Sequence, residues 1–211
     1  MHVEAIASVF TIVEGEFKVL LSRKKTEPYK GYWILPSSML EKDSTLEEKV
    51  EECVYTKFGL SKLEYEQCCT FSDVSRNPKK RVIGVSFLTI IDSRIAEEIE
   101  LDECNEWFNI DKLPKLGYDH ENIIVETIKV LKNKIIQSYT LKKMFPSDFT
   151  LPEIQKMYEQ VLGHEIDRRN FRKKFVSAEL IEETGDKNLS TNGRPAKLYR
   201  FKDEINNKLL F

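Results

Sequence analysis

The sequence predicts an α+β fold in two domains, and two observations support this prediction. Over residues 1–140, short segments typical of strands are mixed with two helical patterns. Beyond residue 141 the pattern changes to helix, turn, helix and then two strands. At 211 residues the chain is long enough for one large domain or two modest ones. We therefore expect one domain over 1–140 and a second over 141–211.

Composition and the N-terminus predict an ordinary cytosolic protein. Hydrophobic residues make up 41% of the chain and charged residues 32%, as in many globular proteins. No uncharged apolar run approaches the ~18–20 residues that span a bilayer. The first residues lack a basic segment followed by an apolar stretch and a cleavage site, so we expect no signal peptide.

The cysteines predict neither a disulfide framework nor a metal site. No two of them form a C-x-x-C pair, and none lies in a His/Cys cluster with zinc spacing. Two are adjacent, which suits a strand better than a metal site. We expect reduced, mostly buried thiols and no metal or cofactor; the four residues are Cys53, Cys68, Cys69 and Cys104.

In the first domain, the pattern predicts two helices among several strands. Thr45 and Glu48 have the spacing of a capping box and Gly59 is a suitable C-terminal cap, so we expect a helix over about 44–58. Apolar residues recur at helical spacing after Asp119, which predicts a second helix. We expect a loop over 24–40, and strands within 3–23, with a turn at 14–16, and over 64–72, 81–91 and 106–109.

The second domain begins with the signature of a helix-turn-helix. Thr150 and Glu153 form another capping-box pattern, and Gly163 is placed to end the helix that follows. After a short turn, Asp167 is a suitable N-terminal cap for a second helix. Two helices joined by a turn of three or four residues that contains glycine are typical of DNA-binding domains.

The second helix of this motif has the residue types of a recognition helix. Phe171 and Phe175 fall on one face, which would hold the helix to its domain. The other faces offer arginine for guanine or phosphate and asparagine for adenine. The candidate DNA-binding residues of this helix are Arg168, Arg169, Asn170, Arg172, Lys173 and Lys174.

A basic hairpin follows, as in the wing of a winged helix. Asn192-Gly193 predicts a turn, and Arg194 and Lys197 would contact the DNA backbone or minor groove. Residues 141–211 carry 14 Lys and Arg against 11 Asp and Glu, whereas residues 1–140 carry 19 against 24. This charge asymmetry favours a DNA-facing second domain. The alternative is a small helical domain with a solvated basic face.

Residues 35–60 resemble the Nudix box, G-x5-E-x7-REUxEExGU, in which U is aliphatic. In that family the box forms a loop–helix–loop whose glutamates hold Mg²⁺ against a diphosphate. Aligned on the proline and the closing glycine, LPSSMLEKDSTLEEKVEECVYTKFGL matches the box at Val54, Gly59 and Leu60. The resemblance implies a Nudix-like α/β/α sandwich for the first domain.

The residues that Nudix chemistry needs are replaced in this box. The three metal-binding glutamates correspond to Cys53, Thr56 and Lys57, at i, i+3 and i+4 on one helix face. A thiol, a hydroxyl and an ammonium remove the negative cage and add a repelling cation, so we expect no family-type Mg²⁺ site and no hydrolysis. Ser38, Ser44 and Glu52 replace the first glycine, the first glutamate and the arginine, and the acids that remain nearby, Glu41, Glu47, Glu48 and Glu51, have the pattern of a solvated surface.

Taken as a whole, the chain resembles the Nudix-related transcriptional regulators, which join a Nudix-like sensor to a winged helix. RNPKKRVIGVSF is similar to the R-D-P-x-x-R-V-I-S-V segment of that family, and WFNIDKLPKLGYDHENII is similar to W-F-x-x-x-x-L-P-x-L-x-x-D-H. FTLPEIQKMYEQVLG, DRRNFRKKF and GRPAKLYRF match its C-terminal motifs. The resemblance covers nearly the entire chain.

This resemblance implies a regulator of NAD or sugar metabolism that acts as a dimeric repressor or activator on a double-stranded DNA operator. A small-molecule effector, either ADP-ribose, a related nucleotide or a sugar, would enter the former substrate pocket. Arginines suit phosphates because they are planar multiple donors, and aromatic rings suit a base or a sugar face. The candidate effector-binding residues are Arg23, Trp33, Phe71, Arg76 and Arg81, and the helix from Asp119 to Ile135 with its linker would connect sensor to DNA-binding domain.

Two alternatives belong to other functional classes. The first is a divergent Nudix pyrophosphatase that uses carboxylates outside the family positions. The second is a protein-binding adaptor that keeps both folds without recognising DNA. Phosphate release from ADP-ribose distinguishes the first, and salt-dependent retention on DNA distinguishes the second.

Overall fold

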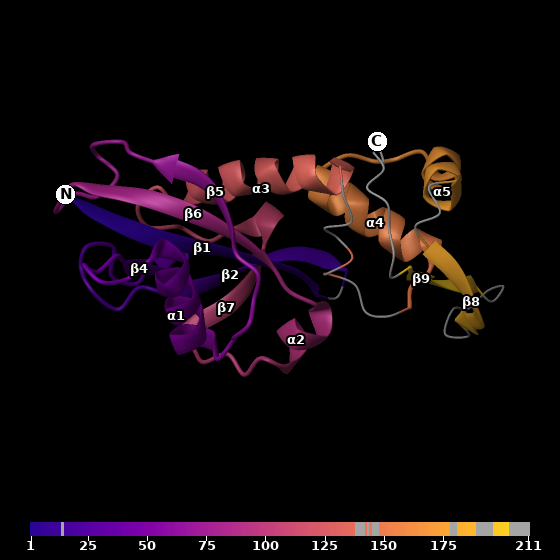
Figure 1. Cartoon of the computed structure of the whole chain (residues 1–211), viewed down its shortest axis with the longest axis horizontal. Helices are drawn as coiled ribbons and strands as arrows, with labels where there is room; N and C mark the ends of the chain where they lie inside the picture. The colour runs from indigo at the N-terminus through magenta and orange to yellow at the C-terminus, as the bar shows by residue number, and fades with distance from the viewer. Residues whose placement is uncertain are drawn as a thin grey trace.

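The computed structural model describes residues 1–13, 15–137, 142, 144, 148–177, 181–188 and 196–202. Figure 1 shows two parts, a larger one built on a sheet with helices on both sides and a smaller one that contains α4, α5, β8 and β9. The boundary expected between residues 140 and 141 falls where most residues are outside the described ranges, and it remains a prediction. No helix in the described ranges is both long enough and apolar enough to cross a bilayer.

The larger part contains a seven-stranded mixed sheet with β1 at its centre. β1 pairs in parallel with β6 in an unbroken register from His2↔Val82 to Phe10↔Ile90, and it pairs antiparallel with β2 and β4. β5 extends the sheet beyond β6, whereas β3 and β7 both pair with β2. The strands are β1 (His2–Val13), β2 (Glu16–Arg23), β3 (Trp33–Ile34), β4 (Ser37–Met39), β5 (Glu66–Phe71), β6 (Val82–Ile90) and β7 (Asn105–Asn109).

Alternating side chains of the sheet form two separate apolar layers. From β1, Ala5, Ala7 and Val9 enter a cluster with residues of α1 (Leu46–Phe58) and α2 (Ser93–Glu98). The intervening Ile6 and Phe10 enter a second cluster with residues of α3 (His120–Gln137). Helices therefore cover both faces of the sheet (Figure 1), and the α/β/α sandwich implied by the family resemblance is confirmed.

Both ends of α1 form as the sequence predicted. The Thr45 side chain accepts a hydrogen bond from the Glu48 backbone N–H at 3.2 Å, and the Glu48 carboxylate accepts from the Thr45 N–H at 2.8 Å. Gly59 ends the helix in the left-handed conformation with φ 70°, which a residue with a β-carbon adopts only at a cost.

Several short elements were not expected from the sequence, among them β3, β4, α2 and the short 3-10 helix η1 (Ile110–Lys112). β3 and β4 lie in the segment predicted as a loop. β4 is a strand of three residues, Ser37–Met39, each of which pairs with a residue of β1. α2 has six residues and is capped by Asp92, whose side chain accepts from the Arg94 N–H. Elements of this length have too few residues for a hydrophobic period to be recognised in the sequence.

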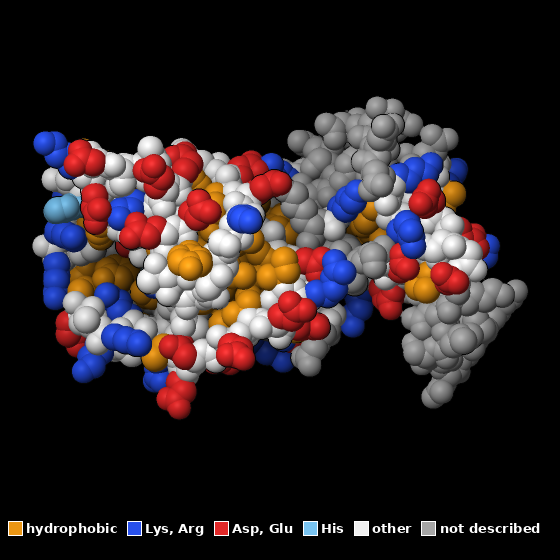
Figure 2. Space-filling model, turned by 60° about the horizontal axis from the view of Figure 1, so that its bottom comes forward, with side chains coloured by type: hydrophobic (Ala, Val, Ile, Leu, Met, Phe, Trp, Pro, Cys, Tyr) orange, Lys and Arg blue, Asp and Glu red, His pale blue; other side chains and the backbone are white. Residues whose placement is uncertain are grey.

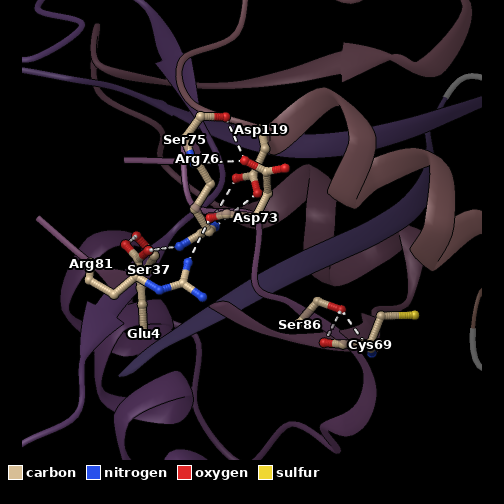
Figure 3. Close-up of polar contacts among 9 residues, drawn as sticks. All are labelled: Glu4, Ser37, Cys69, Asp73, Ser75, Arg76, Arg81, Ser86 and Asp119. Carbon is tan, nitrogen blue, oxygen red and sulfur yellow. Dashed lines mark hydrogen bonds and ion pairs between the residues drawn. The ribbon is translucent and has the colours of Figure 1, made fainter. Parts of the chain in front are cut away.

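Cys68 and Cys69 lie in β5, at an irregularity in its pairing with β6 between Gln67 and Thr70. The Cys69 N–H donates to the Ser86 hydroxyl of β6 at 3.2 Å, and that hydroxyl donates back to the Cys69 carbonyl at 3.3 Å (Figure 3). All four cysteines are free thiols, and Cys53 is buried whereas the other three are partly exposed.

The smaller part has the helix-turn-helix and strand pair that the sequence predicted. α4 (Leu151–Leu162) and α5 (Arg168–Ser177) pack through the buried rings of Tyr158, Phe171 and Phe175, with ring centroids 4.5–5.7 Å apart. β8 (Ile181–Asn188) and β9 (Ala196–Phe201) pair antiparallel. Phe149 forms a β-bridge with Tyr199, which ties the start of this part to the hairpin.

The two parts share one buried apolar cluster rather than having separate cores. Ile12 and Phe17 from the sheet and Leu131 from α3 belong to the same cluster as Ile154 and Phe171 of the helix-turn-helix. At the polar edge of this junction, the Gln160 amide of α4 donates a hydrogen bond to the Gly15 carbonyl in the β1–β2 turn. The helix-turn-helix is thus packed directly onto one end of the sheet.

A buried arginine ties together three segments of the larger part. Arg76, which is only 5% exposed, donates to both carboxylate oxygens of Asp119 at 2.8 and 3.0 Å and to Glu4 of β1 at 3.3 Å (Figure 3). Glu4 also accepts from the Ser37 hydroxyl of β4 at 2.8 Å. The guanidinium passes over Gly84, where an added β-carbon would lie 2.8 Å from its Nη2. The bridge therefore fixes the start of α3 against the end of the sheet.

We predict that Arg76→Ala lowers the free energy of unfolding by about 3–5 kcal/mol, because two partly buried carboxylates would lose their cation. Urea denaturation followed by circular dichroism measures the change. Arg81→Ala is the matched control, since Arg81 is exposed and donates to the Asp73 carbonyl at 2.9 Å, so its change should stay within about 0.5 kcal/mol. Equal denaturation midpoints for Arg76→Ala and the parent would contradict the prediction.

Candidate functional site

A cavity of about 380 Å³ lies where the Nudix-like helix meets the end of β2. Thr56 and Lys57 reach it from α1, and residues 22–25 reach it from the end of β2 and the loop that follows. The opposite wall comes from the segment that leads into β7. The complete lining is Ser22, Arg23, Lys24, Lys25, Ile34, Thr56, Lys57, Asp102, Cys104 and Asn105.

Two of the three positions that hold metal-binding glutamates in the Nudix box therefore face this cavity. The third, Cys53, is buried in the layer between α1 and the sheet. Burial raises the pKa of the Cys53 thiol to about 12, so it remains protonated at neutral pH. A protonated thiol, a hydroxyl and an ammonium are poor ligands for Mg²⁺, which prefers carboxylate and carbonyl oxygens.

Three of the acidic residues around α1 are engaged in other contacts, whereas Glu47 and Glu51 are exposed. Lys49 is buried and forms ion pairs with Glu52 at 2.6 Å and with Glu41 at 3.2 Å. Glu48 completes the capping box at the start of the helix. Within the described ranges, no group of three or more His, Cys, Asp or Glu residues is arranged to hold a metal ion.

Of the five candidate effector residues, one lines the cavity. Arg23 is exposed at the end of β2, where its Nε donates to the Gly31 carbonyl at 3.3 Å. Trp33 packs edge-on against Phe108 with centroids 4.7 Å apart, and it is partly buried against the apolar cluster, as is Phe71 at the end of β5. The guanidinium of Arg76 is held by Asp119 and Glu4, and that of Arg81 lies at the surface beside Asp73 (Figure 3).

His120 was not singled out from the sequence, yet it is the most strongly perturbed base near this site. Its Nδ1 accepts a hydrogen bond from the Leu35 N–H at 2.9 Å, and its Nε2 has no partner in the described part of the chain. Burial, followed by the charges of Arg76, Lys57 and Lys24, lowers its pKa to about 3. The D-H pair in the segment before α3 is the only sequence signal that points to it.

We predict that His120 makes stability depend on pH between about 3 and 6.5, the two ends of its titration. The folded state holds His120 neutral whereas the unfolded chain protonates it, so stability is present above pH 6.5 and is lost as the pH falls. The free energy of unfolding should fall by about 2 kcal/mol between pH 7 and pH 5 through this residue alone.

Urea titrations at several pH values measure this slope, and His120→Asn is the test variant because the Asn oxygen preserves an acceptor for the Leu35 N–H. The variant should be less stable at neutral pH but show a flatter dependence on pH. A slope identical to that of the parent would rule out His120 as its source.

The exposed surface of α5 carries five cations. Phe171 and Phe175 are buried, and all six candidate residues of this helix are exposed. They fall into pairs one helical turn apart, Arg168 with Arg172, Arg169 with Lys173 and Asn170 with Lys174. The Asp167 side chain accepts from the Asn170 backbone N–H at 2.9 Å, which leaves the Asn170 amide group to face outward from the first turn.

A groove of about 440 Å³ joins α5 to the hairpin and to the start of α4. Arg168 and Arg172 line one side, Lys197 of β9 lines the other, and Thr150 and Pro152 close the end. Lys197 is paired with Glu183 of β8 at 2.9 Å. The structure thus brings together the proposed recognition helix and one wing residue, whereas Arg194 lies outside the described residues.

Figure 2 shows Lys and Arg side chains spread over the smaller part, with carboxylates among them. The cations on α5 have no acidic residue within their own helix, since its sequence is RRNFRKKFVS. α5 alone therefore carries five cations and no carboxylate, an arrangement that suits contact with a phosphate backbone.

Residues 142–201 match the family described as the NrtR DNA-binding winged helix domain. The chain is 29% identical over 199 residues to an ADPR-responsive transcriptional repressor, NtrR, of Acinetobacter baylyi, a match that covers 92% of this chain and 79% of the repressor. It is 30% identical over 130 residues to an ADP-ribose pyrophosphatase of Methanocaldococcus jannaschii, which covers 61% of this chain and 76% of the enzyme.

The crystal structure of Shewanella oneidensis NrtR complexed with a 27mer DNA superposes with a TM-score of 0.78 at 28% identity, covering 95% of this chain and 93% of that one. Both the Nudix-like sandwich and the winged helix are thus present in the same order. The chain belongs to the family of Nudix-related transcriptional regulators.

Proposed function

We propose that this protein is a DNA-binding transcriptional repressor whose Nudix-like domain senses ADP-ribose or a related nucleotide or sugar. The observation that carries the proposal is α5, an exposed helix with five cations and one asparagine, anchored by two buried phenylalanines behind a helix-turn-helix. This arrangement suits insertion in the major groove of DNA. The matching family is named for DNA binding, and the Shewanella relative is described in a complex with DNA.

We assign the effector to the cavity between α1 and β2. Its cationic lining suits a phosphorylated ligand, and the Acinetobacter relative is named as responsive to ADPR. Arg23 lines this cavity, and Trp33, Phe71, Arg76 and Arg81 remain candidate effector residues by sequence. The sensor is proposed to span 1–140 and the DNA-binding domain 141–211, a division that the family match over 142–201 supports.

We propose that the Nudix-like domain binds its ligand without hydrolysing it. Thr56 and Lys57 face the cavity where carboxylates would hold Mg²⁺, and Glu41, Glu48 and Glu52 are committed to other contacts. The alternative, a divergent pyrophosphatase, draws support from the similarity to the Methanocaldococcus enzyme. The protein is further proposed to act in the cytosol as a homodimer, since two-fold symmetry doubles the contacts of a small winged helix and matches an inverted repeat.

We predict that Arg172→Ala and Asn170→Ala each weaken binding to the cognate duplex by about 1–3 kcal/mol and relax sequence preference, because each would lose a contact to a base edge. Lys197→Ala should instead weaken binding to all sequences alike and reduce the salt slope by roughly one unit, as expected for a phosphate contact. Fluorescence anisotropy against cognate and scrambled duplexes at several salt concentrations measures both effects, and the titration stoichiometry shows whether two chains bind one duplex.

Lys42→Ala is the matched control, since it removes one exposed positive charge just before α1, in the larger part. It should bind DNA as the parent does. If Arg172→Ala, Asn170→Ala and Lys197→Ala all bind like the parent, the helix-turn-helix is not the DNA-binding surface and the proposed function fails.

We also predict no Mg²⁺-dependent hydrolysis of ADP-ribose, measured as phosphate release coupled to a phosphatase. Lys57→Glu alone should not create activity, because Cys53 and Thr56 still lack carboxylates. Turnover by the parent at ordinary enzymatic rates, on the order of 1 s⁻¹ or more, would favour the pyrophosphatase alternative.

A further inference from the structure

The cavity between α1 and β2 has an unbalanced charge. Four cations line it, Arg23, Lys24, Lys25 and Lys57, against the single carboxylate of Asp102. That carboxylate already accepts from the Cys104 N–H at 3.0 Å and from the Asn105 side-chain amide at 2.6 Å. The cations are therefore not neutralised by the cavity wall, and the space is suited to an anion.

Two lysines of α1 differ in whether carboxylates neutralise them. Lys49 is buried in the first half of α1 and is neutralised by Glu41 and Glu52. Lys57 lies two turns later, is half-buried, and has no ion pair or hydrogen bond within the described part of the chain. Burial lowers the pKa of the Lys57 ammonium and the charge of Lys24 also lowers it, whereas the Glu4 carboxylate acts in the opposite direction. A partly desolvated and unpaired ammonium is costly unless a ligand supplies the counter-charge.

The positive charge of the cavity lining also acts on His120, which is buried behind it. Arg76, Lys57 and Lys24 all act against protonation of His120. Arg76 is balanced by Asp119 and Glu4. In the described part of the chain, the Lys24 ammonium donates a hydrogen bond to the Thr26 hydroxyl and lies 5.7 Å from the centroid of the Tyr118 ring, but it forms no ion pair. Among the described residues, neither the Lys24 nor the Lys57 ammonium is ion-paired with a carboxylate.

From this arrangement we infer that the cavity is a metal-independent diphosphate site, in which the Lys57 ammonium occupies the place of the metal-binding glutamate and neutralises the ligand directly. In a Nudix hydrolase, carboxylates need Mg²⁺ between themselves and the diphosphate. Here the helix position itself carries the positive charge, assisted by Lys24 and Arg23 from the end of β2. Since ammonium groups repel a divalent cation, the ligand binds without Mg²⁺ and keeps its diphosphate bond intact. The inference rests on the proposed effector function and specifies its chemistry.

The test is calorimetric titration of the full chain with ADP-ribose, in EDTA and again with Mg²⁺. The parent should bind equally well in both buffers. Lys57→Gln should bind about 10- to 100-fold more weakly, as expected when a charged hydrogen bond to phosphate is lost. Lys42→Gln, which removes an exposed lysine just before α1 that does not line the cavity, should bind as the parent does.

Inorganic pyrophosphate, titrated in parallel in EDTA, separates this inference from the identity of the effector. If pyrophosphate binds in a Lys57-dependent manner but ADP-ribose does not bind, the diphosphate site holds and the ADP-ribose assignment fails. If ADP-ribose binds only with Mg²⁺, or binds Lys57→Gln as tightly as the parent, the diphosphate site is wrong while the effector assignment holds. If neither ligand binds the parent, both are wrong.

Discussion

The position of every functional element follows from the central strand β1. It is buried along both faces and is paired on both edges, in parallel with β6 and antiparallel with β2 and β4. Because successive side chains alternate between faces, a one-residue slip would exchange the layer under α1 with the layer under α3. The register that places Ile6 and Phe10 under α3 therefore also fixes where α1 stands and where the cavity at its C-terminal half opens.

The Nudix-like helix keeps its place in the fold although its residues at the metal-binding positions of the family differ. α1 keeps the capping box, the aliphatic Val54 and the closing Gly59, so the helix still delivers its last turn to the end of β2. What it delivers there is a hydroxyl and an ammonium in place of carboxylates. Two acids of the helix contribute to its own stability, Glu48 through the Thr45 cap and Glu52 through its ion pair with Lys49. Under the proposed function, one helix thus keeps its place in the scaffold without the metal-binding carboxylates of the family.

Local chemistry was predictable from the sequence, and contacts between distant segments were not. The capping boxes at Thr45 and Thr150 and the buried face of α5 are encoded within a few residues, and each is confirmed. The bridge from Arg76 to Asp119 spans 43 residues, and nothing in the local pattern indicates that the guanidinium is buried. The same holds for His120, whose neutral state results from burial and from cations on other segments. β3, β4 and α2 were not predicted because they are too short to show a hydrophobic period. β3 and β4 also depend on pairing with strands that lie elsewhere in the chain.

The apolar cluster shared by the two parts makes them a single cooperative unit of folding. Met157 and Val161 of α4 are buried together with Ile12 and Phe17 of the β1–β2 hairpin, so separating the parts would expose apolar surface on both. We therefore expect unfolding of one part to destabilise the other. Rigid docking of α4 also means that any rearrangement at the tip of the sheet rotates the whole helix-turn-helix as a body, whereas a flexible tether would absorb the same displacement.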